Sequence, residues 1–237
     1  MGIYEKIFKA GEKGLLILLD PDRIEVSDLN EVISRADDSS FIKAYLVGTS
    51  FLYRGDIDEF IMELKSRSKK PVLIFPGDRY QLSDKADAVL FLSLLSGRNP
   101  EYLIGEQVKA APFVWRYGLE AIPTAYLLID SGHMTSVEFV SNTKPIPRDK
   151  EDLFSAHVLA SYYLGFKLIY LEAGSGAPRS VPLDFIKKAR ELVDLPLLVG
   201  GGLRGREDVE EVLSAGADFA VIGDAVEKSF PLLESFS

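Results

Sequence analysis

The stretch LIYLEAGSGAP, residues 168–178, places one carboxylate, Glu172, between an apolar run and a glycine-rich turn. Such turns often lead to a helix and bind anions through backbone N–H groups, so a negative charge beside one needs its own explanation. A carboxylate can accept hydrogen bonds from the hydroxyls of a phosphate ester, and it can take a proton from a hydroxyl that becomes a nucleophile. Tyr170, two residues earlier, faces the same side of a strand and could share that role. The alternative is an interior Glu172 paired with Lys or Arg.

Glycine also follows the next two apolar runs of the chain. With the turn described above, three turns carry glycine: Gly174 and Gly176 in the first, Gly200, Gly201 and Gly202 in the second, and Gly223 in the third. A single turn of this kind indicates only a tight change of direction. Three at successive strand ends predict a phosphate site, because loops after the last strands of an α/β barrel commonly bind phosphate.

A second anionic corner follows the first apolar run, in LLDPDR at residues 18–23. Asp20 has few basic residues nearby and is a candidate Mg2+ ligand, since Mg2+ takes one or two carboxylates and completes its shell with water and substrate phosphates. Thr49 or Ser50, in VGTS, could add a hydroxyl. The alternative is an Asp turn that caps the next element. Two anionic sites would imply two phosphorylated substrates, one of them bound through the metal.

The elements that position these residues are short apolar runs separated by amphipathic segments. The runs cover residues 15–20, 42–48, 71–75, 88–94, 125–130, 167–173, 196–201 and 219–224. They are continuous rather than alternating, which is typical of strands covered on both faces in a parallel sheet. Eight runs with interleaved helices predict an α/β fold, a (β/α)8 TIM barrel. A doubly wound sheet is the alternative.

Two connections depart from that pattern. Only residues 76–87 separate the third and fourth runs, about the minimum for a crossover with a helix, so we expect the third helix to be shortened or replaced by a loop. Residues 131–149 form a long insertion after the fifth run. A long loop at the C-terminal end of a barrel strand predicts a wall or lid of the active site.

Composition limits the class of protein. The 237 residues are 47% hydrophobic with no dividing linker, which predicts a single domain over residues 1–237. The net charge of −9 argues against a nucleic-acid partner, and the lack of cysteine excludes disulfides and thiolate metal sites. We expect His133 and His157 to be structural or exposed. With no signal peptide or bilayer-spanning run, we expect a soluble, cytoplasmic protein without a transmembrane segment, and transient membrane contact stays open.

Motifs across residues 18–226 resemble the geranylgeranylglyceryl phosphate synthase family, in particular its archaeal-type group, which is related to the heptaprenylglyceryl phosphate synthases. They are LLDPD, VGTS, SLLSGRNP, PIPRDK, YLEAGSGAP, VGGGLR and VIGDA. The resemblance implies a modified TIM barrel whose third helix is replaced by a loop. It also implies a Mg2+-dependent prenyltransferase, in which the C3 hydroxyl of sn-glycerol 1-phosphate attacks C1 of geranylgeranyl diphosphate, and a homo-oligomer, either a dimer or a hexamer.

The resemblance also implies roles for individual residues. Asp20 and Ser50 are metal ligands, and Glu172, with Tyr170, is catalytic. The glycerol phosphate site consists of Tyr170, Leu171, Glu172, Ala173, Gly174, Ser175, Gly176, Gly201, Gly202, Gly223 and Asp224. The family usually has Gly at the position of Thr49, which leaves open which hydroxyl meets the metal. It usually has a neutral residue at the position of Asp224, so we expect that side chain to turn away from the phosphate.

A twenty-carbon prenyl chain cannot enter a packed barrel core, so it needs an apolar groove across the barrel's face. We expect this groove beside the shortened third connection. The candidate lining residues are Phe51, Tyr53, Phe75, Tyr80 and Leu92, with Leu103 and Trp115 at the far end. Each aromatic residue taken alone could equally be ordinary core.

Two other functions remain open at this stage. Another phosphate-binding barrel enzyme, an isomerase or lyase, would need a second acid–base partner or a Schiff-base lysine, and Lys43 and Lys167 stand at strand starts. A non-catalytic phosphometabolite-binding protein would need the glycine loops without the metal corner, so magnesium dependence separates it from the prenyltransferase.

Overall fold

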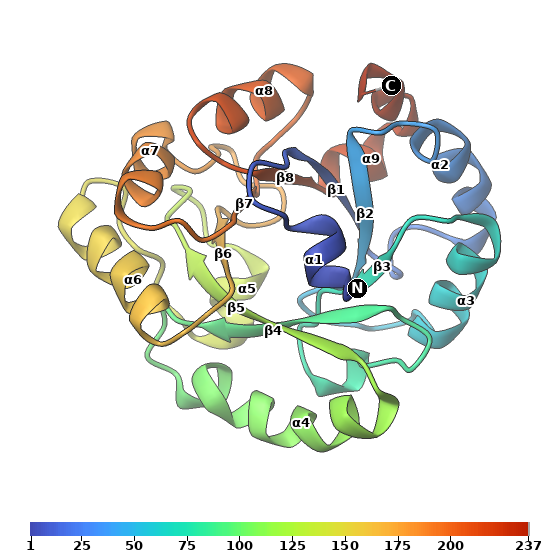
Figure 1. The fold of residues 1–237 in the computed structure, drawn as a ribbon, viewed down its shortest axis with the longest axis horizontal. Coiled ribbons are helices and arrows are strands. Elements are labelled where there is room, and N and C mark those ends of the chain that lie inside the picture. Colours follow the sequence, from blue (N-terminus) through green and yellow to red (C-terminus); the bar gives the residue numbers. More distant parts are fainter. Residues whose placement is uncertain (237) are drawn as a thin grey trace.

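The computed structural model describes residues 1–236, and within them eight parallel strands close into a barrel in the order β1 to β8 (Figure 1). The strands are β1 Gly14–Leu19, β2 Ile42–Val47, β3 Val72–Ile74, β4 Ala88–Leu94, β5 Glu120–Leu128, β6 Leu168–Glu172, β7 Leu197–Gly200 and β8 Phe219–Ile222. The closed order confirms the TIM barrel and excludes the doubly wound sheet.

Helices surround this barrel (Figure 1). They are α1 Ile3–Ile7, α2 Leu29–Ala36, α3 Ile57–Arg67, α4 Glu106–Tyr117, α5 Ser136–Ser141, α6 Glu151–Tyr163, α7 Leu183–Leu192, α8 Arg206–Ser214 and α9 Asp224–Lys228, with short turns η1 Val26–Asp28, η2 Arg79–Gln81, η3 Glu101–Gly105 and η4 Phe230–Phe236. Between β3 and β4, residues 75–87 are all described and contain only the 3-10 turn η2. The expected loss of the helix after the third strand is therefore confirmed.

Alternation along each strand divides the apolar residues into two cores. In β6, Leu168 and Tyr170 point into the barrel, where they pack with residues such as Leu16 and Phe219. Ile169 and Leu171 point outward and pack against the helices. By the same alternation Glu172, the last residue of β6, points inward. The strand thus places a carboxylate at the barrel mouth, directly above an apolar interior.

The N-terminal helix α1 closes the opposite end of the barrel, and Figure 1 shows it lying across that opening. The Phe8 ring, which follows α1, meets the Phe219 ring edge-on at a centroid distance of 5.2 Å. The Glu120 carboxylate, at the start of β5, accepts hydrogen bonds from the backbone N–H groups of Ile3 and Tyr4. The base is therefore sealed, and a ligand can enter only from the C-terminal end of the strands.

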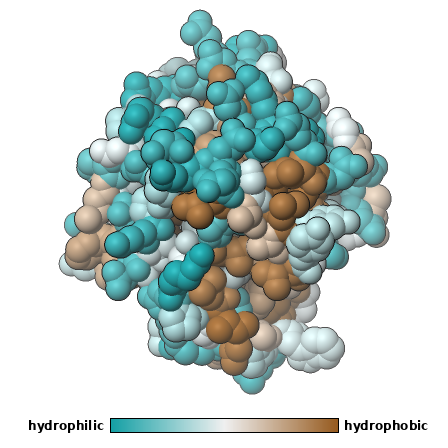
Figure 2. Space-filling model, turned by 90° about the vertical axis from the view of Figure 1, so that its left-hand side faces the viewer, coloured by the Kyte–Doolittle hydropathy of each residue, from teal (hydrophilic) through white to brown (hydrophobic). Residues whose placement is uncertain are grey.

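One side of the barrel exposes apolar side chains. Figure 2 shows them as a band below a mostly polar region, on the side that carries α6 and α7. Exposed residues on α4 and α6 and just after α6 include Phe113, Leu153 and Leu164, the last with an exposed fraction of 66%. Within residues 1–236, no helix combines the length and hydrophobicity needed to cross a bilayer.

Candidate active site

Glu172 is held at the mouth by two hydrogen bonds. One carboxylate oxygen accepts the backbone N–H of Gly174 at 2.5 Å, and the carboxylate also accepts the Tyr170 hydroxyl. Only 6% of the residue is exposed. Burial raises the pKa of Glu172 from 4.5 to about 7, although these two hydrogen bonds work in the opposite direction. A carboxyl group with such a pKa can exchange a proton with a ligand near neutral pH.

An aromatic cluster adjoins Glu172 and is called the aromatic floor below. The Tyr126 ring of β5 meets the Tyr170 ring at 5.4 Å and nearly perpendicular, and the Phe75 ring lies 5.2 Å from Tyr170. Burial, with the nearby Glu172 carboxylate, holds the pKa of both tyrosines well above 10. Both hydroxyls therefore stay protonated and can only donate to or accept from a neighbour as neutral groups.

The glycine turns bring three strand ends together around Glu172. Gly174, Gly176, Gly201 and Gly202 have φ between 68° and 99°, a region that L side chains rarely adopt. The backbones also approach closely, because a methyl group on Gly201 would lie 2.5 Å from the backbone nitrogen of Gly174. Among residues 1–236 the N–H groups of Gly176 and Gly202 have no protein acceptor. They are free to donate to an anion.

The corner formed by Asp20 is more crowded than its sequence suggests. Asp20 is buried after β1; one carboxylate oxygen accepts the N–H of Asp22 at 2.9 Å, and the other lies 3.6 Å from Arg23. Arg23 also pairs with Glu227 at 2.9 Å. The expectation of few nearby basic residues holds in number, since Arg23 is the cation paired with Asp20. A single guanidinium partly neutralises this corner, because it reaches carboxylates from both ends of the chain.

Asp22 anchors the loop after β2. Its carboxylate accepts the backbone N–H groups of Tyr53, Arg54 and Gly55 at 2.6, 2.6 and 2.7 Å. Partial burial works to raise the pKa of Asp22, but these three hydrogen bonds lower it overall. Asp22 therefore has a structural role, but it fixes a distant loop and does not cap the next element; the local turn bond of the Asp-Pro-Asp motif is accepted by Asp20.

The short turn η2 supports the hydroxyl corner. The buried side chain of Gln81 accepts the Thr49 N–H at 3.1 Å and donates to the Thr49 carbonyl at 2.9 Å. Residues 49 and 50 are thereby fixed at the end of β2. The short turn η2, which replaces a full helix after β3, therefore supports the loop after β2 through Gln81.

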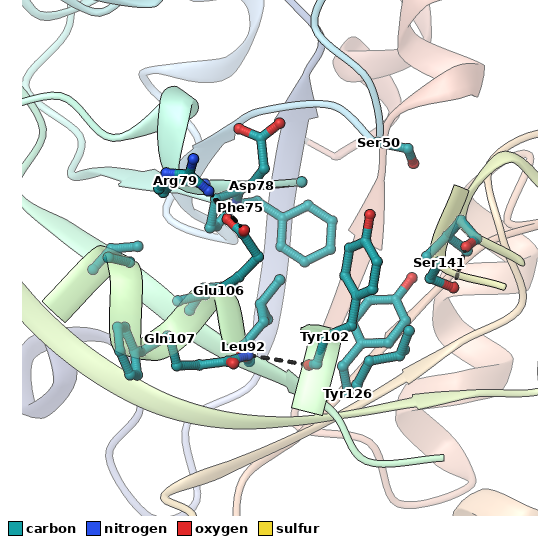
Figure 3. Close-up of a pocket in the computed structure, with 18 of the residues that line it drawn as sticks. Ser50, Phe75, Asp78, Arg79, Leu92, Tyr102, Glu106, Gln107, Tyr126 and Ser141 are labelled. Carbon is teal, nitrogen blue, oxygen red and sulfur yellow. Dashed lines mark hydrogen bonds and ion pairs between the residues drawn. The ribbon is translucent and has the colours of Figure 1, made fainter. Parts of the chain in front are cut away.

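Two cavities meet at this corner. The larger, about 640 Å³, is polar and contains Asp20, Glu172 and the glycine turns. The smaller, about 110 Å³, lies against α4 and is lined by apolar side chains including Phe75, Leu92 and Ala110. Figure 3 shows the Phe75, Tyr102 and Tyr126 rings together in it, with Ser50 at its edge. Residues that line both cavities are Thr49, Ser50, Phe75, Tyr126 and Val137.

A sequence profile of the PcrB family matches residues 8–236. The chain belongs to the PcrB family. It is 45% identical to the geranylgeranylglyceryl phosphate synthase of Flavobacterium johnsoniae, over 98% of this chain and 97% of that protein. The synthase of Thermococcus gammatolerans is 43% identical, over 96% and 88%. Among solved structures, the Thermoplasma acidophilum synthase in complex with sn-glycerol-1-phosphate aligns with a TM-score of 0.89 and 34% identity, over 99% of this chain and 94% of that chain.

In this PcrB chain most of the predicted site residues line one cavity. The polar cavity contains Asp20, Ser50, Tyr170, Glu172, Ser175, Gly176, Gly201, Gly202, Gly223 and Asp224. The side chains of Leu171 and Ala173 instead pack between the barrel and the helices, so these two residues could contribute only backbone atoms. Gly174 lies behind the turn, against Thr135, the residue before α5. The insertion that follows β5 in this PcrB barrel thus forms a wall of the site.

Asp224 is directed at cations. Its carboxylate lies 2.7 Å from the Lys228 ammonium and 3.7 Å from Arg23. Arg23 and Lys228 line the polar cavity together with Asp224, so the turning of this side chain away from a bound phosphate stays a prediction. Sequence reasoning about the PcrB chain missed Arg23, Tyr126 and Glu227. Tyr126 could have been found, because it stands beside Tyr170 in the β5–β6 register. No local signal pairs Arg23 with Glu227.

The predicted apolar groove is confirmed in part. Phe75 and Leu92 line the small cavity, but Tyr53, Tyr80, Leu103 and Trp115 do not, and Phe51 lines the polar cavity. Trp115 is 89% exposed on the outer face of α4. Ala110, one turn and a half earlier on α4, faces the cavity instead. In this member of the PcrB family α4 therefore contributes the small side chain of Ala110 to the cavity wall.

Proposed function

We propose that this enzyme, a prenyltransferase by its family, joins the C3 hydroxyl of sn-glycerol 1-phosphate to C1 of geranylgeranyl diphosphate. The observation that carries the proposal is the meeting of the polar and apolar cavities at Thr49 and Ser50. A prenyl diphosphate has an apolar chain joined to a strongly anionic group. The junction of the two cavities suits such a molecule, with its diphosphate toward Asp20 and its chain toward α4.

Glu172 and the glycine turns suit the second substrate. The free N–H groups of Gly176 and Gly202 would donate to the phosphate, and the Glu172 carboxylate would accept the C3 hydroxyl. As the hydroxyl oxygen bonds to C1, Glu172 takes its proton. The bond from C1 to the diphosphate oxygen breaks, and its electron pair leaves with the diphosphate. The carboxyl's pKa of about 7 matches this task near neutral pH.

The aromatic floor suits the same step. Phe75 and Tyr126 line both cavities, so their rings would lie near C1 as it gains positive charge. Ring faces attract cations, by about 2 kcal/mol where water is excluded. The same rings exclude water, which would otherwise compete with the glycerol hydroxyl as the nucleophile.

We propose Mg2+ as the cofactor. The donor set fits it: Asp20 supplies one carboxylate and Ser50 or Thr49 a hydroxyl, and water and diphosphate oxygens complete the shell of a hard cation. Among residues 1–236, no group of three or more His, Cys, Asp or Glu side chains gathers as a protein-only metal site. When bound, the ion would neutralise the leaving diphosphate. Asp20 and Ser50 would hold and orient it.

The apolar cavity has room for only part of a twenty-carbon chain. Its volume of about 110 Å³ is well below the roughly 300 Å³ at which small-molecule pockets usually begin. The rest of the chain would need the cavity to widen beside η3 and the start of α4, where Tyr102 and Gln107 line it. Geranylgeranyl diphosphate is therefore the proposed donor on family grounds, and product analysis decides the chain length.

We also propose that the enzyme acts in the cytoplasm as a homo-oligomer. The exposed apolar residues on α4 and near α6, including Phe113, Leu153 and Leu164, support a second copy as partner. Light scattering of the wild-type protein and of a Leu153→Glu, Leu164→Glu variant tests this. A monomeric wild-type protein refutes it. Cell fractionation tests the compartment.

The decisive experiment is a magnesium-dependent assay with radiolabelled sn-glycerol 1-phosphate and prenyl diphosphates of several lengths. The wild-type enzyme should form the ether and release diphosphate, and chelation of Mg2+ should stop it. Asp20→Asn should lose turnover but bind glycerol phosphate normally in calorimetry, because Asp20 lies across the cavity from the glycine turns. Equal losses of turnover and glycerol phosphate affinity would refute the two-site arrangement. Absence of an ether product would refute the function.

A further inference from the structure

The charges that line the polar cavity are unevenly paired. The lining acids are Asp20, Asp22, Glu172, Asp224 and Glu227, and the lining cations are Arg23, Arg204 and Lys228. Arg23 is engaged by Asp20, Asp224 and Glu227, and Lys228 by Asp224. Arg204 is different: within residues 1–236, no carboxylate oxygen lies within 4.0 Å of its guanidinium, the limit for an ion pair.

Arg204 also has a fixed position. It follows the glycine turn after β7, and its backbone N–H donates to the Asp208 carboxylate at 2.6 Å. One terminal nitrogen of its guanidinium donates to the Pro178 carbonyl, in the turn after β6, at 3.0 Å. The side chain therefore bridges the two turns whose free N–H groups face the cavity. Its remaining N–H groups have no acceptor in the described chain, and the exposed side chain lines the polar cavity.

A phosphate monoester brings close to two negative charges into a cavity that already holds more acids than cations. Backbone N–H groups are neutral dipoles and leave that charge uncompensated, and Glu172 adds to it once ionised. We infer that Arg204 is the positioning residue for the phosphate of the acceptor substrate, because among residues 1–236 it is the lining cation that no protein carboxylate engages. This inference rests on the proposed function and names the group that selects an anionic acceptor.

The variant Arg204→Gln removes the charge and keeps a neutral side-chain N–H donor at this position. A charge-assisted hydrogen bond at a partly exposed site predicts an increase of about tenfold in KM for glycerol phosphate. We expect kcat and the KM for the prenyl diphosphate to stay within about twofold. The fall of kcat/KM with added salt should also become shallower, because one attractive charge is lost.

Two neighbouring arginines provide matched controls. Arg206→Gln removes an exposed charge two residues away that is paired with Glu210 and lies outside the polar cavity. Arg179→Gln removes a charge from the turn after β6 whose guanidinium is directed at the Ser131 carbonyl. Neither control should change the KM for glycerol phosphate by more than about twofold. Equal effects of all three variants, or equal KM increases for both substrates, would overturn the assignment.

Calorimetry with inorganic phosphate separates this inference from the proposed reaction. Wild-type protein should bind phosphate about tenfold more tightly than Arg204→Gln, whether or not it forms an ether product. Equal phosphate affinities, or no measurable binding to the wild-type protein, would overturn the role of Arg204. A difference in phosphate affinity without any prenyl transfer would overturn the function and leave the anion site in place.

Discussion

Replacing Glu172 with Gln should make the unliganded protein more stable above pH 7 while it removes the catalytic base. Burial raises the pKa of the folded carboxyl from 4.5 to about 7. Below pH 4.5 the group is protonated in both the folded and the unfolded chain, and its contribution to stability is fully present. As the pH rises toward 7 the unfolded chain releases this proton first, so the contribution is lost. Gln is neutral throughout and loses nothing.

The size of the effect follows from the two pKa values. A separation from 4.5 to about 7 corresponds to about 3 kcal/mol in full, and to about 2.5 kcal/mol between pH 5 and pH 8. The free energy of unfolding of Glu172→Gln, minus that of the wild-type protein, should therefore rise by about 2.5 kcal/mol over this range. Other titrating groups cancel in the difference.

Urea unfolding of both proteins at several pH values measures this difference. Glu211→Gln is a suitable control, because it makes the same chemical change at a residue that is exposed in the middle of α8. The transfer rate of Glu172→Gln should fall by about 10²–10⁴. A stability difference that is the same at pH 5 and pH 8 would refute the argument that Glu172 is desolvated.

Three further outcomes are expected. The kcat/KM of the wild-type enzyme should rise with pH and level off above about 7, because Glu172 acts as a base when ionised; a flat profile from pH 6 to 8 would contradict this. In Asp22→Ala, the backbone amides of residues 53–55 lose their acceptor and should therefore exchange hydrogen faster, whereas the exchange of the barrel amides should not change. Ala110→Phe should lower kcat/KM for a twenty-carbon relative to a ten-carbon donor by about tenfold or more, whereas Trp115→Ala should leave the preference unchanged. A changed preference in the second variant would place the limit of chain length on the outer face of α4.

The sequence predicted the barrel because buried parallel strands leave a local signal. The run at 88–94 coincides with β4, and the short connection after β3 was visible as a residue count. The start of β5 was missed by five residues, because Glu120 and Pro123 interrupt its apolar pattern. The polar side chain of Glu120 is accommodated at the start of β5 because it accepts hydrogen bonds from the backbone of α1, which is far away in the sequence.

The site was predictable where it depends on one strand end and its turn, as with Glu172. It was not predictable where it depends on contacts between distant segments. The pairing of Arg23 with Glu227 joins residues 204 positions apart, and only the closure of the barrel brings them together. Trp115 was chosen for its size, but its side chain points away from the cavity. A single bulky residue does not show which face of a helix packs against the protein.

The close backbone approach at Gly201 limits what conventional mutagenesis can reveal. Alanine scanning removes side chains, whereas the anion-binding groups of the turns are main-chain N–H groups that persist in every variant. At Gly201 the same substitution adds a methyl group 2.5 Å from the Gly174 nitrogen, at a φ of 80°. Inactivity of Gly201→Ala would therefore report displacement of the turn beside Glu172 rather than a lost contact. Replacing a backbone amide with an ester, which deletes one N–H and adds no bulk, is the substitution that isolates the donor.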